Sequence, residues 1–457
     1  MDLDLIYNVY FLGIGGIGMS ALARYFHTMG KYVAGYDLSS SSITDTLIHL
    51  GIPVHFKEDI DSIDERFHEK ERTLIVLTPA VPETHAELKF FKENGYAILK
   101  RSEILGMLFN NKHGIAIAGT HGKTTVTSMT AYIIDCSDVG CNAFLGGILK
   151  NINSNLILNP FGRWVVAEAD EYDRSFLQLF PEIALITWID ADHLDIYASQ
   201  DQIRDSFIQF LEQTKEGGTI ILKKGIEPDF DTGSRKLYSY SLNDKADFYA
   251  TNISSHQGRY AFNIVTPEDT IDDVQLKVIG LTNVENAVAA ASLAWSAGVD
   301  KDTIRNSLSS FSGVQRRFDI QYQDRHRVYI DDYAHHPREL DAFISSLRVV
   351  FPDRKLTGIF QPHLYSRTRD FASEFAQSLS ALDELILLDI YPARELPIEG
   401  VSSKIIFDRV SIPAKTMCSK DELLGIIKKK NIEVLLTMGA GDIDRMVNPI
   451  KEMMTRQ

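Results

Sequence analysis

Residues 114–125 read GIAIAGTHGKTT, and this stretch decides the fold that we expect for the chain. A strand-like run leads into a glycine-containing loop, and Gly-Lys-Thr opens a helical stretch, which is the arrangement of a phosphate-binding loop. Backbone N–H groups around Gly122 would hold phosphates, Lys123 would reach the β- and γ-phosphates, and the Thr124 hydroxyl would ligate Mg²⁺. Ile117 stands where the standard motif has glycine, so the form here is the shorter Gly-Thr-x-Gly-Lys-Thr. The predicted nucleotide-binding residues of this loop are Gly119, Thr120, His121, Gly122, Lys123, Thr124 and Thr125.

Two acidic clusters follow in the same part of the chain. EADEYD occupies residues 168–173 and DADHLD occupies residues 190–195, each after a strand-like run. Carboxylates at the carboxyl ends of parallel strands, next to a phosphate loop, lie where a nucleotide's metal needs hard oxygen ligands. A neutral histidine can ligate a second metal. Either cluster alone would be interpreted as solvated loop charges and helix caps, but both beside a phosphate loop favour a metal site. The predicted metal ligands are Thr124, Glu168 and His193.

A second glycine-rich loop lies near the N-terminus. Residues 13–18 read GIGGIG between a strand-like run and a helical stretch, and Asp37 follows at the end of the next strand. This is the pattern of a dinucleotide-binding fingerprint. Small residues let the backbone approach a diphosphate, and the helix N-terminus supplies N–H donors. The loop therefore predicts a diphosphate-bearing ligand without identifying it, and the alternative is a tight, closely packed turn. The predicted ligand-binding residues are Gly13, Gly15, Gly16, Ile17, Gly18 and Asp37.

The chain divides into three α/β blocks, at residues 1–108, 109–319 and 320–457. Buried strand-like runs alternate with amphipathic helical stretches, which is typical of parallel sheets flanked by helices. We expect Rossmann-like first and last domains and a central domain of the P-loop ATPase type. The predicted strands include Asn8–Leu12, Tyr32–Tyr36, Thr73–Leu77, His113–Ala118, Trp164–Ala167, Ile183–Thr187, Arg327–Ile330, Leu356–Phe360, Glu384–Leu388 and Val434–Thr437.

Composition narrows the class of protein. A chain of 457 residues with 44% hydrophobic residues can bury ample core, and its formal net charge of −15 disfavours binding to nucleic acid or to an anionic membrane. No apolar run reaches membrane-spanning length, and the N-terminus lacks the features of a signal peptide. Cys136, Cys141 and Cys418 fit no zinc pattern and read as free thiols, so we expect a cytoplasmic protein.

A glycine fingerprint and a phosphate loop in successive blocks are an unusual pair, because dehydrogenases do not need the second element. With these motifs the chain resembles the Mur ligases over roughly residues 8–445. The motifs that carry the resemblance are AGTHGKTT (118–125), EADEYDRSF (168–176), TWIDADHLDIY (187–197), GLTNVENAVAA (280–290), FSGVQRRFD (311–319), DDYAHHP (331–337) and FQPHLYSRTRD (360–370).

The resemblance implies a three-domain, ATP-dependent amide-bond ligase. Its first domain would hold a UDP-sugar, its second ATP and two Mg²⁺ ions, and its third the incoming amino acid, in a monomer or homodimer. The motif GIGGIGMSALA at 13–23, DDYAHHP and HLYSRTRD look like the branch of the family that joins L-alanine to UDP-N-acetylmuramate. The γ-phosphate would pass to the lactyl carboxylate, and the alanine amine would then displace phosphate. Lys123, Glu168, His193 and Arg367 would carry this chemistry.

The resemblance also assigns residues to the base of ATP. Asn283 and Asn286 would contact the adenine side. The local alternative is that Thr282 and Glu285 form a capping box and that the asparagines merely lie at that helix start.

Two residues near the start of the third block are assigned to the rest of the nucleotide. Arg317 would reach the ATP phosphates, and Asp332 would hold the ribose. The alternatives are that Arg317 is a surface residue of the pair with Arg316, and that Asp331 and Asp332 cap the end of a strand.

Tyr333, His363 and Arg367 would form the L-alanine site. A small amino acid offers mainly its carboxylate, for which arginine is a two-pronged donor. The alternative is that Arg367 and Arg369 belong to a solvated helix start, but positive charge there opposes the helix dipole.

Three positions depart from the pattern of the family or distinguish its branches. Leu364 stands where some relatives have arginine, which removes one expected alanine contact, and Trp188 stands where asparagine is common, which puts a sugar-nucleotide contact in doubt. Residues 205–212 lack the lysine that several sibling ligases carbamylate, as the alanine-adding branch does.

Three other functions stay open. The first is the sibling ligase that reattaches recycled murein tripeptide to the same sugar nucleotide. The second is a nicotinamide oxidoreductase that uses the GIGGIG loop, and the third is a nucleotide-binding regulatory protein without ligase chemistry.

Overall fold

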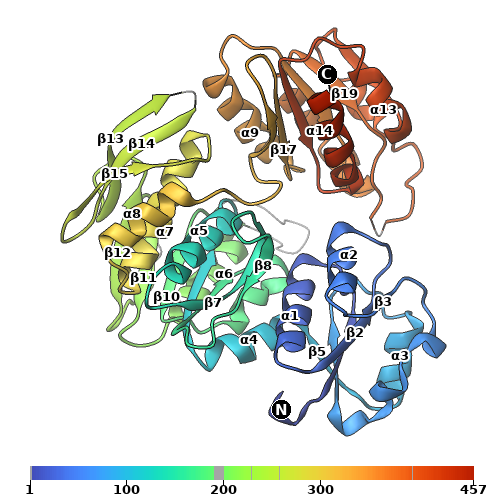
Figure 1. Ribbon diagram of the computed structural model, residues 1–457, viewed down its shortest axis with the longest axis vertical. Helices are drawn as coiled ribbons and strands as arrows, with labels where there is room; N and C mark the ends of the chain where they lie inside the picture. Colours follow the sequence, from blue (N-terminus) through green and yellow to red (C-terminus); the bar gives the residue numbers. More distant parts are fainter. Residues whose placement is uncertain (1–2, 190–199, 228, 257, 394, 457) are drawn as a thin grey trace. The chain divides into compact units, whose positions relative to one another are not determined.

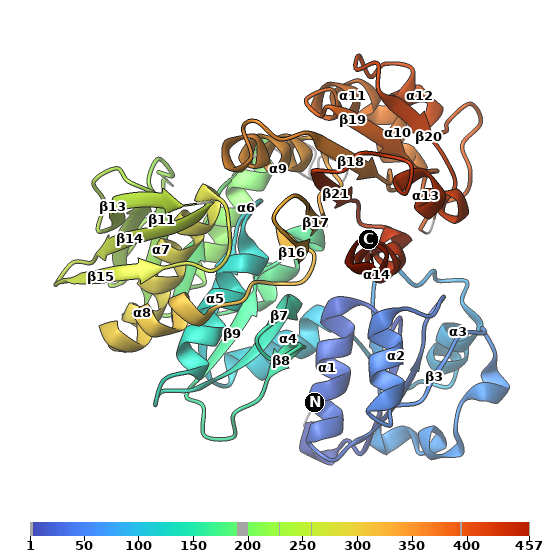
Figure 2. The same cartoon turned by 45° about the horizontal axis from the view of Figure 1, so that its top comes forward.

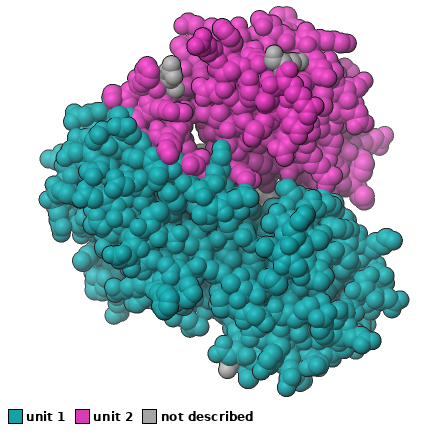
Figure 3. All heavy atoms as spheres, in the orientation of Figure 1, with its two compact units in different colours: residues 1–253, 261–275, 284–311 teal, residues 254–260, 276–283, 312–457 magenta. Residues whose placement is uncertain are grey.

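Three β-sheets flanked by helices organise the residues that the structure describes (Figure 1). The computed structural model describes residues 3–189, 200–227, 229–256, 258–393 and 395–456. This arrangement confirms the predicted α/β class with mainly parallel sheets. Contacts divide the chain into two compact units (Figure 3). The first comprises residues 1–253, 261–275 and 284–311, and the second comprises residues 254–260, 276–283 and 312–457.

The first sheet is parallel throughout and lies in the first unit. Its strand order is β3-β2-β1-β4-β5, so the chain starts in the middle and winds outward in both directions. This order places the GIGGIG loop at the carboxyl end of the central strand. The strands are β1 Asn8–Leu12, β2 Tyr32–Tyr36, β3 Val54–His55, β4 Thr73–Leu77 and β5 Ala97–Lys100, and the helices are α1 Ile17–Thr28, α2 Ser42–His49, α3 Ala86–Glu93 and α4 Arg101–Asn110.

The second sheet has the order β15-β14-β13-β12-β11-β10-β6-β9-β7-β8. Neighbouring strands are parallel from β12 to β7, and β8 is antiparallel to β7. The strands are β6 His113–Ala118, β7 Cys141–Leu149, β8 Ser154–Ile157, β9 Trp164–Glu168, β10 Ile183–Ile186, β11 Thr219–Lys223, β12 Lys236–Ser241, β13 Phe248–His256, β14 Arg259–Val265 and β15 Thr270–Gln275. The helices are α5 Lys123–Asp135, α6 Gln200–Glu212, α7 Leu281–Ser296 and α8 Lys301–Ser310.

The third sheet lies in the second unit, in the order β16-β17-β21-β18-β19-β20, and is parallel except for β16. Apolar residues cover both of its faces, with α9, α11 and α12 on one and α13 and α14 on the other (Figure 2). The strands are β16 Asp319–Gln323, β17 Val328–Asp332, β18 Leu356–Phe360, β19 Glu384–Leu387, β20 Lys415–Met417 and β21 Val434–Met438. The helices are α9 Pro337–Val350, α10 Tyr365–Asp370, α11 Ala372–Leu379, α12 Lys404–Phe407, α13 Lys420–Ile427 and α14 Val447–Arg456.

Short 3-10 helices complete the described elements. They are η1 Leu3–Leu5, η2 Ile60–Ser62, η3 Glu65–His68, η4 Lys70–Arg72, η5 Tyr172–Gln178 and η6 Asp442–Met446. Among the described residues, no helix is both long enough and apolar enough to cross a membrane.

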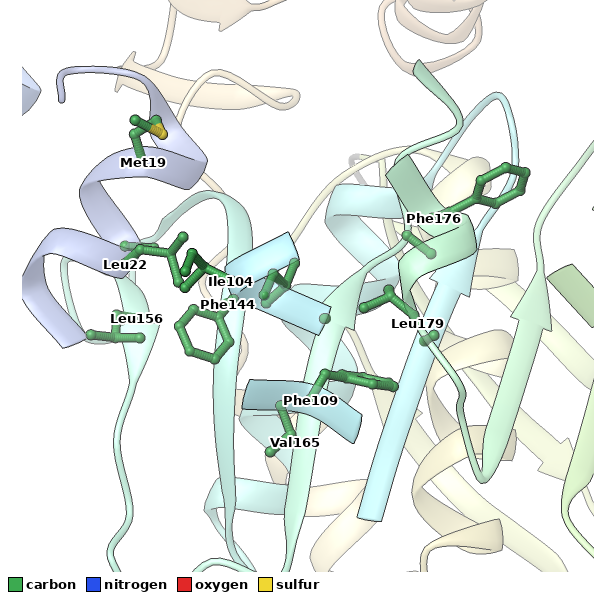
Figure 4. Packing of buried hydrophobic residues seen from close by; sticks show 14 of the residues in the cluster. Met19, Leu22, Ile104, Phe109, Phe144, Leu156, Val165, Phe176 and Leu179 are labelled. Carbon is green, nitrogen blue, oxygen red and sulfur yellow. The ribbon is translucent and has the colours of Figure 1, made fainter. Parts of the chain in front are cut away.

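Within the first unit, a shared apolar core joins the first sheet's helices to the second sheet. Leu22 of α1 and Ile104 of α4 pack with Phe144 and Leu156 of the second sheet (Figure 4). Two hydrogen bonds also join α1 to the second sheet. Asn155 Nδ2 of β8 donates to Ile17 O at 2.7 Å and to Ser20 Oγ at 2.9 Å. The helix that follows the GIGGIG loop is therefore fixed to an edge strand of the second sheet.

One local interpretation from the sequence is wrong. Helix α7 begins at Leu281, so Thr282 lies inside the helix and does not cap it with Glu285. Glu285 instead forms an ion pair with Lys223 at 2.9 Å. The side-chain amide of Asn283 donates to Ile279 O at 2.7 Å.

Candidate active site

The phosphate loop lies at the carboxyl end of β6, between the ends of β9 and β10. Helix α5 begins at Lys123, and Gly122 precedes it with a φ of +81°. Gly119 has a φ of +124°, and a Cβ atom there would lie 2.2 Å from Thr187 Oγ1. Both positions require glycine, since other residues rarely adopt these backbone angles. The turn can thus bring backbone N–H groups of the helix start toward a phosphate.

The end of β10 holds the phosphate loop in place. The buried Thr187 hydroxyl lies within hydrogen-bond distance of the carbonyl oxygens of Ala118 and His121. The Thr120 N–H donates to Trp188 O at 2.9 Å. Sequence reasoning did not single out Thr187, although it is the first residue of the TWIDADHLDIY motif. The indole ring of Trp188 lies under Lys223, whose Nζ is 4.8 Å from the ring centre.

Lys123 is a buried cation at the start of α5. Its Nζ donates to Gly119 O at 2.6 Å and to Glu171 Oε1 at 2.8 Å. Burial by itself lowers the pKa of this ammonium, but the carboxylates of Glu171, Asp170 and Glu168 outweigh burial and raise the pKa above its usual value. Lys123 is therefore protonated at neutral pH. The sequence placed Glu171 in an acidic cluster but did not predict this ion pair.

Thr124 and Glu168 form the predicted pair of oxygen donors. The Thr124 hydroxyl donates to Glu168 Oε1 at 3.2 Å. Gly146 of β7 gives the carboxylate its room, because a Cβ atom there would lie 1.9 Å from Glu168 Oε2. His193, the third predicted ligand, lies outside the described residues, as do the other residues of its acidic cluster.

This donor set fits magnesium held together with a nucleotide. The part of the chain that the structure describes contains no group of three or more His, Cys, Asp or Glu residues arranged around a metal site. Mg²⁺ is commonly held by one or two carboxylates, with water and substrate phosphates filling its other positions. A hydroxyl and a carboxylate beside a phosphate loop meet that requirement.

Asn286 is close to the phosphate loop, whereas Asn283 belongs to the second compact unit. A Cβ atom on Gly122 would lie 3.0 Å from Asn286 Oδ1. The start of α7 is therefore brought to the loop within the first unit. Asn286 is the member of the predicted adenine pair that this proximity supports.

The GIGGIG loop is braced by Asp37. The Gly15 N–H donates to Asp37 Oδ2 at 2.7 Å, and Gly13 has a φ of +86°. Burial raises the pKa of Asp37, and the hydrogen bond from Gly15 opposes that shift. Gly16 precedes α1, whose first residues are Ile17 and Gly18. The structure thus brings all six predicted residues of this loop together.

In the second unit, Asp332 is a buried carboxylate at the end of β17. It accepts hydrogen bonds from Phe318 N at 2.7 Å and Ala334 N at 2.9 Å. Burial raises its pKa to about 6, although the charge of Arg317 opposes the shift. The Arg317 guanidinium lies 5.3 Å from the ring centre of Tyr333.

The neighbouring Arg316 has a structural contact of its own. Its Nε lies 3.2 Å from the fully buried Asp331 carboxylate, and its guanidinium donates to Gly439 O. Both guanidinium groups lie near the Tyr333 ring, Arg316 at 5.2 Å and Arg317 at 5.3 Å from its centre, but Arg316 is also tied to the sheet whereas the charge of Arg317 acts on Asp332.

The three residues predicted for the amino acid lie in one cluster of the second unit. The rings of Tyr333, His335, His363 and Tyr391 follow one another, with centroid separations of 5.2, 6.0 and 5.8 Å. Arg367, on α10, has a buried Nη1 that finds no hydrogen-bond partner among the described residues. A buried arginine nitrogen of this kind suits the carboxylate of a ligand.

His335 and Tyr391 were missed by sequence reasoning. His335 Nδ1 lies 3.0 Å from Tyr333 O, so it carries the hydrogen, because a carbonyl oxygen can only accept. Burial lowers the pKa of His335, and the carboxylate of Glu339 opposes that shift. His335 stands in DDYAHHP and was available as a signal, whereas Tyr391 lies in no motif. Leu364, where some relatives have arginine, has a φ of +71° and donates its N–H to Tyr391 O at 3.0 Å.

Comparisons with known proteins match the chain to Mur ligases from near its beginning to near its end. The model described as the Mur ligase family catalytic domain matches residues 8–113, the Mur ligase middle domain matches residues 117–294, and the Mur ligase glutamate ligase domain matches residues 316–441. A UDP-N-acetylmuramate–L-alanine ligase of Parabacteroides distasonis is 50% identical over 459 aligned residues, which cover 100% of this chain and 99% of that protein. A protein of the same name from Phocaeicola vulgatus is 48% identical and covered completely, as is this chain.

Solved structures of Mur ligases share the fold of this chain. A UDP-N-acetylmuramate–alanine ligase from Thermotoga maritima superimposes with a TM-score of 0.83 at 27% identity, over 98% of this chain and 100% of that one. A murein peptide ligase from Psychrobacter arcticus shares the fold, with a TM-score of 0.74 at 22% identity over 99% of each chain.

Proposed function

Because the chain belongs to the Mur ligase family, we propose that it joins L-alanine to the lactyl carboxylate of UDP-N-acetylmuramate at the expense of ATP. The products would be ADP, phosphate and UDP-N-acetylmuramoyl-L-alanine, a peptidoglycan precursor made in the cytoplasm. The observation that carries this proposal is the end-to-end similarity, at about half of all positions, to ligases of that name. The buried Lys123 and the Thr124–Glu168 pair supply the matching chemistry.

The reaction needs an activated carboxylate, because hydroxide is too poor a leaving group for an amine to displace. One carboxylate oxygen attacks the γ-phosphorus, and ADP leaves. The alanine nitrogen then attacks the carbonyl carbon of the acyl phosphate, loses its proton, and phosphate leaves with the original carboxylate oxygen. Each half of the reaction brings together charged or electron-rich groups, so positioning and charge compensation dominate the catalysis.

The phosphate loop would supply that compensation on the nucleotide. The N–H groups at the start of α5 would bind phosphate oxygens, and protonated Lys123 would offset the charge that builds up on the γ-phosphate. Mg²⁺, held by Thr124 and Glu168 and by His193 at a second site, would neutralise the phosphates. In this proposal Asn283 and Asn286 contact the adenine, Arg317 the phosphates and Asp332 the ribose.

The other two substrates would bind at the other two clusters. The GIGGIG loop, braced by Asp37, would hold the diphosphate of the sugar nucleotide. The buried Nη1 of Arg367 would bind the alanine carboxylate, and Tyr333 and His363 would enclose the small side chain. A carboxylate on a desolvated arginine is held strongly, because both partners are charged and the donor geometry is fixed.

A phosphate-release assay tests the proposal. Purified protein would be mixed with ATP, Mg²⁺ and UDP-N-acetylmuramate, and phosphate would be measured with L-alanine, with the murein tripeptide, or with neither. We expect release that requires both the sugar nucleotide and alanine. Phosphate release with the tripeptide but not with alanine would move the chain to the recycling branch. No phosphate release with either acceptor would contradict the ligase function.

A further inference from the structure

A small pocket in the first unit lies between the beginning of α4 and the end of β9, where the predicted metal ligand Glu168 stands. Arg101, the first residue of α4, lines it together with Glu168 at the end of β9 and Asp170 just beyond. Phe176 of η5 also lines the pocket. The pocket therefore places the Arg101 cation beside two carboxylates. One is Glu168, the proposed Mg²⁺ ligand, and the other is the nearby Asp170.

Arg101 also covers the GIGGIG loop. A Cβ atom on Gly18 would lie 3.0 Å from Arg101 Cδ and 3.1 Å from Arg101 Nη1. Glycine at this position lets the arginine side chain pass directly over the start of α1. One guanidinium is thus in contact with the sugar-nucleotide loop and borders the pocket that contains Glu168.

The charge of Arg101 is not paired directly with any carboxylate that the structure describes, although Glu168 and Asp170 line the same pocket. Arg101 makes no hydrogen bond or ion pair with any residue that the structure describes. As the first residue of a ten-residue helix it also opposes the helix dipole. A cation that is unpaired and unfavourably placed, yet half-buried in a pocket, is explained by an anion that binds there.

We propose that Arg101 binds an oxyanion of the sugar nucleotide, either a diphosphate oxygen or a lactyl carboxylate oxygen. This inference rests on the proposed function, because it takes the GIGGIG loop and Glu168 to face the same substrate. Arginine can hold either group through two parallel N–H donors. Arg101 would thereby fix the distance between the diphosphate and the reacting end of the substrate.

Titration calorimetry on the full-length protein without ATP tests the inference. Wild-type protein, Arg101→Ala and Arg101→Lys would be titrated with UDP-N-acetylmuramate and with UDP-N-acetylglucosamine, which has the same diphosphate but no lactyl carboxylate. We expect Arg101→Ala to weaken UDP-N-acetylmuramate roughly 10- to 100-fold, as for the loss of a charge-assisted hydrogen bond. Arg101→Lys should recover part of that loss.

The second ligand identifies the oxyanion. Equal weakening of both ligands assigns Arg101 to the diphosphate, and weakening of UDP-N-acetylmuramate alone assigns it to the carboxylate. Unchanged affinity of Arg101→Ala for both ligands would overturn the inference, and if the wild-type protein still released phosphate with alanine, the ligase function would stand. A wild-type protein that binds neither ligand would overturn both.

Arg72→Ala is the matched control. Arg72 is an exposed arginine of the same unit, and it precedes β4 at the amino edge of the first sheet, away from the GIGGIG loop. Its removal changes the net charge equally and should leave both affinities as in the wild type. Thermal denaturation of each variant would show that the Arg101 effects do not come from unfolding.

Discussion

The Lys123 ammonium lies 2.8 Å from Glu171 Oε1, and the two side chains are 13% and 2% exposed. This ion pair sits at the start of α5, where the proposed reaction needs a cation for the γ-phosphate. In the proposed reaction Lys123 would therefore have two roles that a single substitution removes together, one in the fold and one in phosphoryl transfer.

Replacing Lys123 by alanine should lower kcat by about a hundredfold or more, since a preorganised cation at the transferring phosphate is lost. The same change removes the cation from a buried carboxylate, so we expect the unfolding free energy to fall by about 3 kcal/mol. Urea denaturation and phosphate release would measure the two effects. The double variant Lys123→Ala/Glu171→Gln should regain stability and remain inactive. Normal acyl-phosphate formation in Lys123→Ala would remove this residue from the phosphate loop's chemistry.

Gly146→Ala should weaken the use of Mg²⁺ while the protein stays folded. The new Cβ atom would lie 1.9 Å from Glu168 Oε2, so the carboxylate must turn away from Thr124. We expect the Mg²⁺ concentration for half-maximal rate to rise about tenfold, as when the support of a metal ligand is lost. Gly425→Ala, with open space around its Cβ position, is the control. An unchanged Mg²⁺ requirement in Gly146→Ala would argue against Glu168 as a ligand.

Arg367→Ala should raise KM for alanine at least tenfold with little change in KM for ATP. The substitution removes the buried guanidinium nitrogen that would donate to the alanine carboxylate in the proposed site. Arg369, two residues along α10, is exposed and pairs with Asp370, so Arg369→Ala should behave as the wild type. Steady-state kinetics with each substrate varied in turn would measure both. Equal effects of Arg367→Ala on the two KM values would remove Arg367 from the amino-acid site.

The activity should rise with pH through about 6 if ionised Asp332 accepts hydrogen bonds from the ribose of ATP, because its pKa is raised to about 6. Below that pH the carboxyl is protonated, so kcat/KM for ATP should fall. Asp332→Asn should lower kcat/KM and abolish this limb of the profile. A wild-type profile without that limb, or an unaltered limb in the variant, would contradict the ribose role.

The contribution of Asp332 to stability should change with pH in the opposite direction to the activity. Between its usual pKa of 3.8 and about 6, Asp332 holds more proton in the folded than in the unfolded protein. Its contribution to the unfolding free energy therefore declines as pH rises through that window. Denaturation of the wild type and Asp332→Asn at pH 4.5 and 7 would detect the difference.

The fold was largely predictable because buried strands and glycine loops have strong local signatures. Strands Asn8–Leu12, Tyr32–Tyr36 and Leu356–Phe360 lie at the predicted residues, since continuous apolar runs between loops leave few alternatives. The capping-box alternative at Thr282 and Glu285 had the right spacing but is wrong, because α7 begins at Leu281 and Glu285 pairs with Lys223.

The site was predictable where a local sequence motif indicates the chemistry of its residues. Lys123, Thr124 and Glu168 come together as the phosphate loop and the first acidic cluster suggested. Gly146 and Tyr391 could not be found in this way, because each matters through a contact with a residue far along the chain. Arg101 belongs to the same class, since its significance comes from its proximity to Gly18 and the shared pocket with Glu168.

The most direct test of the proposed reaction is an isotope measurement with UDP-N-acetylmuramate that carries ¹⁸O in both oxygens of its lactyl carboxylate. The protein would be incubated with this substrate, ATP, Mg²⁺ and L-alanine, and mass spectrometry would follow the label. We predict one ¹⁸O in each phosphate released and one in the amide carbonyl of the product. Unlabelled phosphate, or labelled substrate that remains unconsumed when alanine is present, would contradict ligation through an acyl phosphate.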